Sequence, residues 1–350
     1  MIIVRFTSGL GNQMFQYAFY LYLKKRYEKV SVKADLTWFY ANNDHHGYEL
    51  CRIFGREKDS LFSLDEATKG EIFKVTGLLP NLLKPRNMIT TDIESDRISG
   101  FSDGASKAFE TFRRYPNRIL REINGKKLSR NIIDELSKDI GNRDIVRADG
   151  SVYNELYDLT VSLDENRDHY FKGFFTQEKY YKPVLDEVRR IFRFPALDPG
   201  NEKTADRIRS SESVGIHVRR GDYLTVYNGQ FKVLSRSYYE AAIGEISLHT
   251  GKSLEELNFF VFSDDPDFVK KEFDWLPHKA IITDNTGEDS YKDMQLMSLC
   301  KHNVIANSTF SQWAALLNVN EDHITVYPAD YLADEDNEDK TLKNWIKIKS

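Results

Sequence analysis

The hydrophobic pattern at the start of the chain predicts a strand, a loop and a helix. Residues 1–6 are a short apolar run, TSGLGN at 7–12 interrupts it, and residues 14–27 place apolar and aromatic side chains at helical spacing. The alternating segment KVSVKAD at 29–35 predicts a second strand. Two strands joined by a helix form a βαβ unit, which favours a parallel sheet.

The second half of the chain alternates strands and helices with few interruptions. The pattern predicts strands at 213–219, 258–263, 280–284, 303–306 and 324–327, and helices at 202–211, 237–249, 266–273, 289–300 and 308–317. Strands that alternate with helices of this length are typical of a doubly wound parallel sheet.

The segment between these two regions has a weaker pattern. Residues 60–161 are charged and mixed, with helical stretches at 63–73 and 105–112, and the pattern gives them no clear order of elements. Residues 176–192 then predict a helix, with Pro183 close to its start.

The domain organisation follows from the length of the chain and from one proline-containing segment. A chain of 350 residues is long for a single hydrophobic core. The segment FPALDPGN at 194–201 holds two prolines and a glycine, a composition that suits a linker. We expect an N-terminal α/β domain over residues 1–195, which includes the helical middle segment, and a C-terminal Rossmann-like domain over residues 196–350.

Composition and charge argue against several classes of protein. Hydrophobic residues make up 41% of the chain and charged residues 29%, which predicts a globular protein. The net charge of -5 disfavours a general nucleic-acid binder. The chain has two cysteines, Cys51 and Cys300, and neither a signal-peptide pattern nor an apolar run of membrane-spanning length. We therefore expect a cytoplasmic protein whose cysteines are core residues or idle thiols.

Two polar segments follow predicted strands, where ligands bind in open parallel sheets. The first is HVRRGDY at 217–223, in which Arg219 and Arg220 are adjacent and Asp222 follows closely. Paired guanidiniums are costly to bury unless an anion meets them, and arginine suits bidentate phosphate contacts. The alternative is a surface salt bridge with Asp222.

The second polar segment, NVIANSTFS at 303–311, leads from a predicted strand into a predicted helix. Amides and hydroxyls at a helix start form an anion site that the helix dipole strengthens. The alternative is ordinary capping by Asn307 or Ser308. Because both segments belong to one predicted sheet, we favour a shared phosphate site.

One pattern at the N-terminus imitates a different chemistry. Gly9 and Gly11 between a strand and a helix, with Asp35 at the end of the next strand, resemble the nicotinamide dinucleotide fingerprint. The third glycine of that fingerprint would fall at Met14. An NAD(P)-dependent oxidoreductase is therefore the weaker alternative.

Five segments together resemble the bacterial α-1,2-fucosyltransferases of glycosyltransferase family 11. They are SGLGNQMFQYA at 8–18, GFFTQEKYYKPVLDEVRRIF at 173–192, HVRRGDY at 217–223, FSDD at 262–265 and DMQLMSLCKHNVIANSTFSQW at 293–313. The segments cover the start and most of the second half in the same order as in that family, so the resemblance is specific.

The resemblance implies a GT-B-like fold of two Rossmann-type α/β domains facing a cleft. It also implies GDP-fucose as the donor and a galactose-terminated glycan as the acceptor, with no metal and no other cofactor. Arg219 would hold the β-phosphate beside Arg220, while His217 and Asp293 would hold the nucleoside. Further donor contacts are implied for Ser308, Thr309, Phe310, Gly9, Gly11, Asn12 and Gln13.

The implied chemistry is physically coherent. Transfer from β-linked GDP-fucose to an α-linked product inverts C1 by one in-line displacement through an oxocarbenium-like transition state. Charge develops on the departing GDP, where Arg219 and the helix start at Ser308 supply fixed donors. Asp222 is the candidate general base, with orientation of an arginine as its alternative role. A non-catalytic glycan- or nucleotide-binding protein of the same fold is a further alternative.

Metal-binding patterns in the chain have simpler explanations. DPD at 265–267 fits the Asp-x-Asp motif of Mn²⁺-dependent glycosyltransferases, but it starts a predicted helix, where proline and acidic residues are favoured. DED at 334–336 lies in a charged run, and HH at 45–46 has no further ligands at metal spacing. We expect no metal site.

The C-terminal segment TLKNWIKIKS at 341–350 mixes lysines with Trp345 and isoleucines. Such a segment could touch an anionic membrane surface, which would make the protein peripheral at the inner membrane face. Packing onto the first domain is the alternative that we favour. We expect at most peripheral membrane contact.

Overall fold

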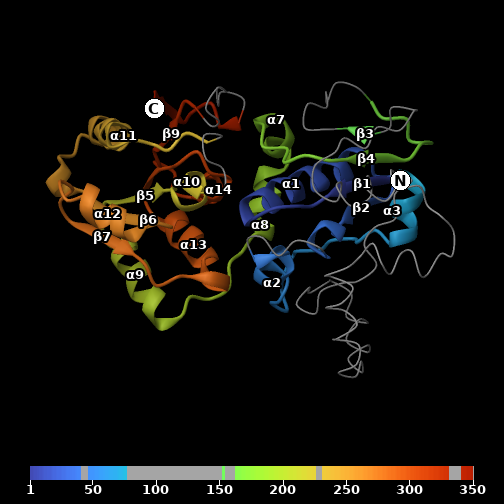
Figure 1. Ribbon diagram of the computed structural model, residues 1–350, viewed down its shortest axis with the longest axis horizontal. Helices are drawn as coiled ribbons and strands as arrows, with labels where there is room; N and C mark the ends of the chain where they lie inside the picture. Colours follow the sequence, from blue (N-terminus) through green and yellow to red (C-terminus); the bar gives the residue numbers. More distant parts are fainter. Residues whose placement is uncertain (41–45, 77–151, 154–161, 226–230, 331–339, 350) are drawn as a thin grey trace.

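The computed structural model describes residues 1–40, 46–76, 152–153, 162–225, 231–330 and 340–349. Within them the chain forms two parallel β-sheets with helices around each, and the two units lie side by side in Figure 1. The predicted helix at 105–112, the acidic run at 334–339 and His45 lie outside the described residues.

The first sheet has four parallel strands in the order β2-β1-β4-β3. They are β1 (Ile2–Arg5), β2 (Val32–Asp35), β3 (Val152–Tyr153) and β4 (His169–Phe171). All side chains of β1 are buried, as expected for a strand with both faces covered. The helices of this unit are α1 (Leu10–Arg26), α2 (Leu50–Phe54), α3 (Lys69–Thr76), α7 (Glu178–Tyr181) and α8 (Leu185–Ile191).

The second sheet has six parallel strands in the order β10-β9-β8-β5-β6-β7. They are β5 (Ser213–Val218), β6 (Asn258–Ser263), β7 (Lys279–Ile282), β8 (His302–Val304), β9 (Thr325–Pro328) and β10 (Ile346–Ile348). Counted from β5, this is the strand order 3-2-1-4-5-6 of the Rossmann fold. The predicted α/β class with two Rossmann-type units, GT-B-like, is confirmed.

Except for α10, the helices described in the second unit agree with the hydrophobic pattern to within a few residues. They are α9 (Pro199–Arg209), α10 (Gly221–Thr225), α11 (Arg236–Thr250), α12 (Pro266–Glu272), α13 (Tyr291–Leu299) and α14 (Thr309–Leu316). Helix α10 was not predicted. The expected domain boundary at residue 195 falls in the connection between α8 and α9.

Two helix predictions in the first unit were wrong in extent. The helix expected at 176–192 is interrupted by a 3₁₀ turn at Lys182–Val184, because Pro183 has no N–H group and restricts the residue before it. The helix expected at 63–73 begins only at Lys69. The backbone before it instead pairs with β2, where Ala34 donates to Asp65 O and accepts from the Ala67 N–H.

The C-terminal segment completes the second sheet, so the prediction that it packs onto the first domain was wrong. Strand β10 pairs in parallel with β9, with Ile346 opposite Val326. Trp345 is buried, and its ring centroid lies 6.4 Å from that of Tyr327. The physical reason is the outer edge of β9, whose backbone groups gain partners when a further strand is added.

The two units are joined through the first turns of α1 and α14. A side chain at Gly11 would place its Cβ 2.6 Å from the carbonyl carbon of Thr309 and 2.7 Å from the nitrogen of Phe310. One turn further along both helices, the ring centroids of Phe15 and Trp313 are 4.8 Å apart. The helices therefore run parallel, with both N-termini at the same end, and Figure 1 shows them between the two sheets.

This contact also corrects the expected loop at 7–12. Helix α1 starts at Leu10, so Gly11 and Asn12 belong to its first turn. Glycine is a poor helix former, but here it allows the close approach of α14. The packing of α1 against α14 therefore outweighs the low helix propensity of Gly11.

Polar contacts between the units add to this packing. Arg52 donates from Nη1 to the Glu288 carbonyl at 2.9 Å, and Arg189 donates from Nε to the Leu316 carbonyl at 2.8 Å. The Tyr181 hydroxyl donates to the Lys340 carbonyl at 3.0 Å.

We predict that Gly11→Ala destabilises the protein by about 1–3 kcal/mol, because the new methyl group overlaps backbone atoms that cannot move without separating α1 from α14. The control is Gly244→Ala in α11, where a Cβ meets no atom within 4 Å. Removal of a mid-helix glycine there should stabilise by up to about 1 kcal/mol. Urea unfolding of both variants measures the difference, and equal effects would contradict the packing role of Gly11.

Candidate active site

The structure brings the two predicted polar segments together. Strands β5 and β8 are neighbours, with Ile216 opposite Val304, and the chain leaves them in opposite directions across the sheet. This is the topological switch point, where ligands bind in open α/β sheets. The Tyr223 hydroxyl, after β5, donates to the Asn307 carbonyl, after β8, at 2.6 Å.

Arg219 is held by two carboxylates. Its Nη2 donates to Asp222 Oδ2 at 2.6 Å, and its Nη1 lies 3.2 Å from Asp264 Oδ2. Burial lowers the pKa of Arg219, but Asp264 and Asp222 raise it more, so the net shift is upward. A guanidinium has five N–H groups, so these contacts leave donors for a ligand.

Asp264 also organises the turn that follows β5. Its carboxylate accepts from the backbone N–H groups of Arg220 at 2.9 Å and Gly221 at 3.0 Å. A Cβ at Gly221 would lie 3.0 Å from Asp264 Oδ2, so this approach favours glycine. The side chain of Arg220 turns away from Arg219. It donates to Asp265 at 3.2 Å and stacks 3.5 Å from the Phe268 ring centroid.

The protein itself supplies the anions that the paired arginines require. Two guanidiniums (Arg219, Arg220) and three carboxylates (Asp222, Asp264, Asp265) give a formal local charge of +2 − 3 = −1. The salt bridge with Asp222, weighed as an alternative, is therefore present, with both side chains only 19–25% exposed. An anionic ligand would have to share Arg219 with Asp222 and Asp264.

Asp222 retains one oxygen for other chemistry. Oδ2 is paired with Arg219, whereas Oδ1 is buried and has no hydrogen-bond partner within the described residues. A buried carboxylate oxygen without a partner is unfavourable unless a ligand or a proton donor meets it. Asp222 can thus both orient Arg219 and accept a hydrogen bond.

His217 is buried beside the start of α14. Its ring centroid lies 5.6 Å from that of Phe310, and its Nδ1 atom is buried without a hydrogen-bond partner in the described part of the chain. Burial, with Arg219 as a second cause, lowers the pKa of His217 to about 3. The ring is therefore neutral near pH 7.

Ser308 caps helix α14. Its Oγ accepts from the Phe310 N–H at 3.3 Å, so capping by Ser308 is realised. Thr309 and Phe310 form the first turn and touch Gly11 of α1. The N-termini of two parallel helices therefore meet near the switch point, and both dipoles favour negative charge there.

The predicted donor contacts at the start of α1 have structural partners. Gln13 is fully buried: its Nε2 donates to the carbonyls of Ser8 and Gly47, and its Oε1 accepts from the Glu49 N–H. Gly9 is the N-cap of α1 with an extended backbone, and Asn12 is half-buried.

The features that imitate the dinucleotide fingerprint are also used within the fold. A Cβ at Gly11 would meet the backbone of α14, so helix packing accounts for this glycine without a cofactor phosphate. Asp35 is buried and accepts from the Tyr170 hydroxyl at 2.6 Å and from Thr37. No carboxylate at this position is exposed to hold a ribose, as that fingerprint requires.

Asp293 lies in a separate network on α13. Its Oδ1 accepts from Asn285 Nδ2 at 2.8 Å, and Asn285 exchanges hydrogen bonds with Asn201 on α9. Burial raises the pKa of Asp293 to about 7, and the hydrogen bond from Asn285 opposes this shift. Within the described residues its hydrogen bond is to Asn285 and not to Arg219 or Ser308.

Two residues of the site were missed by the sequence analysis. Asp264 appeared only within the FSDD segment, although acidic residues at the end of a strand next to β5 are the signal that could have found it. Asn285 follows β7 and carries no comparable signal. Asp265 caps α12 by accepting from the Phe268 N–H at 3.1 Å, so the predicted capping role is confirmed.

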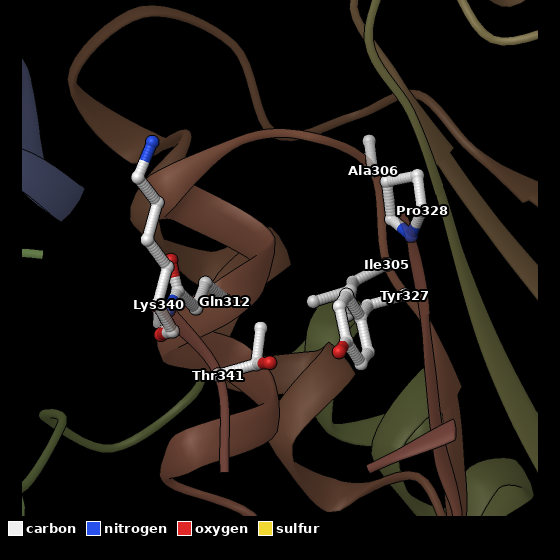
Figure 2. A pocket seen from close by; sticks show the side chains of 7 residues that line it. All are labelled: Ile305, Ala306, Gln312, Tyr327, Pro328, Lys340 and Thr341. Carbon is white, nitrogen blue, oxygen red and sulfur yellow. The ribbon is translucent and has the colours of Figure 1, made fainter. Parts of the chain in front are cut away.

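A small cavity lies beyond the ends of β8 and β9. Figure 2 shows residues of both strand ends on one side and residues of α14 and the C-terminal segment on the other, with Gln312 beside Lys340. Its volume is about 10 Å³, enough for about one water molecule and far below the roughly 300–1,000 Å³ of typical ligand pockets. It is too small for a nucleotide sugar.

The described residues show neither a cluster of metal-ligating side chains nor a helix of membrane-spanning character. Among these residues no group of three or more His, Cys, Asp or Glu side chains could hold a metal ion. No helix in the same ranges has both the length and the apolar content needed to span a bilayer.

Comparison with known proteins gives one family and several relatives. The model of glycosyl transferase family 11 matches residues 109–349. The chain is 27% identical to the O-antigen biosynthesis glycosyltransferase WbnK of Escherichia coli, with 98% of each chain covered. It is 26% identical to an alpha-1,2-colitosyltransferase of Escherichia coli, with 99% of this chain and 98% of the relative covered.

A shorter match links the chain to a mammalian enzyme. Galactoside alpha-(1,2)-fucosyltransferase 2 of Oryctolagus cuniculus is 34% identical over 36% of this chain and 34% of its own length. The bacterial relatives match the whole chain, whereas this one matches about a third of it.

We predict that Asp293→Asn changes the pH dependence of stability. The pKa of Asp293 is about 7 in the folded protein, against an ordinary value of 3.8. The protonated carboxyl therefore makes its full contribution to the free energy of unfolding below about pH 4, and this contribution is lost as the pH rises to 7. Between pH 4 and pH 8, the free energy of unfolding of the variant should therefore rise relative to that of the wild type by on the order of 1–4 kcal/mol. Urea titrations at both pH values measure this, with Asp274→Asn at an exposed position as the control. A difference that does not change with pH would contradict the prediction.

Proposed function

Because the chain belongs to glycosyl transferase family 11, we propose that it is an inverting galactoside α-1,2-fucosyltransferase. It moves L-fucose from GDP-β-L-fucose to the 2-hydroxyl of a galactose-type acceptor in a surface glycan. The observation that carries the proposal is that the Arg219–Asp222 ion pair and the start of α14 follow neighbouring strands, at the switch point of a Rossmann sheet. An O-antigen glycosyltransferase among the relatives supports a glycan acceptor, and an α-1,2-fucosyltransferase supports the linkage.

The donor is held through its diphosphate and its base. The diphosphate lies at the converging starts of α14 and α1, where Ser308, Thr309, Phe310 and the backbone of Gly9 to Asn12 favour an anion. Arg219 donates its remaining N–H groups to the β-phosphate. His217 and Asp293 hold the nucleoside, and an ionised Asp293 would accept from the two N–H donors of guanine.

The reaction is a single displacement at C1 of the fucosyl group. The acceptor oxygen forms the new bond to C1 while the bond from C1 to the β-phosphate oxygen breaks, and the electron pair leaves with GDP. Arg219 and the helix amides stabilise that charge. Asp222 Oδ1 takes the proton of the 2-hydroxyl, since it is a buried acceptor beside the arginine that binds the leaving group.

A second donor is favoured by one observation. The alpha-1,2-colitosyltransferase matches the whole chain, whereas the fucosyltransferase of Oryctolagus cuniculus matches about a third of it. Colitose is fucose without its 3-hydroxyl group. GDP-colitose is therefore the second candidate donor, with the same linkage and the same site.

An oxidoreductase and a non-catalytic binding protein both fit the structure less well. An NAD(P)-dependent oxidoreductase would need Gly11 and Asp35 for its cofactor, and both are used in packing and hydrogen bonding. A non-catalytic binding protein would not need the buried oxygen of Asp222. We propose no cofactor beyond the co-substrate GDP-fucose, no nucleic-acid partner, and a cytoplasmic location with at most peripheral membrane contact.

The decisive experiment offers the protein GDP-fucose, GDP-colitose, UDP-galactose and CMP-sialic acid with galactose-terminated acceptors and detects transfer by mass. We expect efficient transfer from GDP-fucose only, to the 2-hydroxyl, with activity unchanged by EDTA because the charge of GDP is stabilised by Arg219 and helix amides. Preference for UDP or CMP sugars would overturn the donor, and preference for GDP-colitose would support the second candidate. Loss with EDTA and recovery with Mn²⁺ would overturn the metal-free mechanism.

The role of Asp222 can be separated from that of Arg219 by two variants. We predict that Asp222→Asn keeps the affinity for GDP within a few-fold while single-turnover transfer falls about 10²–10⁴-fold, as expected for loss of a general base. Arg219→Lys should weaken GDP binding as well, because an ammonium cannot reproduce a guanidinium fork. Asp267→Asn, at a 91% exposed carboxylate, is the matched control. If Asp222→Asn loses GDP affinity in step with transfer, Asp222 only orients Arg219.

A further inference from the structure

Two amide side chains bond to each other beside Asp293. Asn201 donates from Nδ2 to Asn285 Oδ1 at 2.8 Å, and Asn285 donates from Nδ2 to Asn201 Oδ1 at 3.0 Å. Asn285 Nδ2 also donates to Asp293 Oδ1 at 2.8 Å. Asn201 Nδ2 also donates to Asp198 Oδ2 at 2.8 Å. Each amide nitrogen therefore uses both of its N–H groups, and Asn285 is buried.

The direction of these hydrogen bonds is set at Asp198. Its carboxylate caps α9 by accepting from two backbone N–H groups of the first turn, and it pairs with Lys292 Nζ at 3.0 Å. Hydrogen bonds from Asn201, with Lys292 as a further cause, lower the pKa of Asp198, so its carboxylate is ionised and can only accept. Asn201 must therefore turn its N–H groups toward Asp198. Asn285 then presents its oxygen to Asn201 and an N–H group to Asp293.

This network lies at the ligand-binding edge of the second sheet. Asn285 follows the carboxyl end of β7, and Asp293 is in the first turn of α13. Helix α13 packs against both α9 and α14, and Figure 1 shows it between them. Helix α14 begins at the same edge, after β8. Asp293 is therefore at the edge of the sheet where ligands of open α/β folds bind.

The two forms of a carboxyl group match different purine bases. Guanine presents two N–H donors side by side, at N1 and at its 2-amino group, and the two oxygens of a carboxylate accept from both. Adenine presents an acceptor at N1 beside its 6-amino donor. It therefore matches a protonated carboxyl group, which has one O–H donor and one acceptor oxygen. The form that Asp293 adopts decides which of the two bases it can hold by two hydrogen bonds.

We propose that Asn285 is a positioning residue that gives the nucleoside site its preference for guanine, because its fixed N–H group keeps Asp293 an acceptor. The inference rests on the proposed function, in which Asp293 holds the base of the donor. Asn285 acts through Asp293 and needs no contact of its own with the nucleotide. A purely structural role, as a clamp between α9 and the loop after β7, would instead affect all nucleotides equally.

The titration of Asp293 gives this role a pH signature. Burial raises the pKa of Asp293 to about 7, the hydrogen bond from Asn285 opposes the rise, and the charge of Asp284 adds to it. The carboxylate, and with it the preference for guanine, is present above pH 7 and is lost as the pH falls through 7. Without the donor on Asn285 the pKa rises further, so the preference appears only at a higher pH.

The test measures the Kd of GDP and of ADP by calorimetry at pH 6 and pH 8. Both ligands carry the same diphosphate, so its own titration cancels in the ratio of the two constants. The wild type should prefer GDP at pH 8, and this preference should fall about ten-fold or more at pH 6. Asn285→Leu should lower the preference at pH 8 about ten-fold. Asn285→Asp, which keeps the shape and replaces the donor by an acceptor, should lower it at least as much.

The matched control is Asn320→Leu. This exposed asparagine also donates two hydrogen bonds, to Cys300 O at 3.1 Å and to Asn318 Oδ1 at 2.8 Å, but it lies before β9, at the opposite edge of the sheet. The control should keep the wild-type ratio of the two constants at both pH values. An equal change of the ratio in Asn320→Leu would contradict a specific role of Asn285.

The outcomes separate this inference from the proposed function. If the wild type does not prefer GDP over ADP at pH 8, the proposed donor is wrong, and the inference fails with it. If the wild type prefers GDP but both Asn285 variants keep the ratio and its pH dependence, only the inference is wrong. A parallel loss of affinity for GDP and ADP would indicate the structural clamp and would also overturn it. If Asn285→Leu does not fold, Asn285→Asp alone decides.

Discussion

The contact between Gly11 and the first turn of α14 is the constraint on which the rest of the structure depends. It sets how closely the two sheets approach and brings the starts of two helices to one place. The aromatic packing of Phe15 on Trp313 then continues the contact into the core. The first unit contributes the start of α1 to this junction and the second unit contributes the start of α14, so the two helix starts meet only because the units are packed together.

Charge compensation gives the site its second constraint. The arginines after β5 are held by the carboxylates of Asp222, Asp264 and Asp265, so the guanidinium of Arg219 is oriented before any ligand arrives. Preorganised donors of this kind stabilise developing charge without a rearrangement during the reaction. The same carboxylates reduce the net positive charge of the arginine pair, whereas the positive ends of the two helix dipoles still favour an anion.

Much of the second unit could be predicted from its sequence, because strands and helices there alternate with clear periods and short connections. That the polar segments after β5 and β8 lie close together could be predicted for the same reason, since the position after a parallel strand is informative. Helix α10 and strand β10 were missed because they are short and partly polar. The role of Gly11 could not be predicted, because it depends on α14, almost three hundred residues away in the chain. Asp264 depends likewise on which strand lies beside β5.

The parallel arrangement of α1 and α14 has a consequence for cohesion. Two aligned dipoles with their positive ends together repel each other, and an anion placed between those ends neutralises both at once. Ligand binding and attachment of the two units therefore share one electrostatic term. By linkage, a change that loosens the contact between α1 and α14 lowers the affinity for the ligand. A bound ligand in turn strengthens the attachment of the two units to each other.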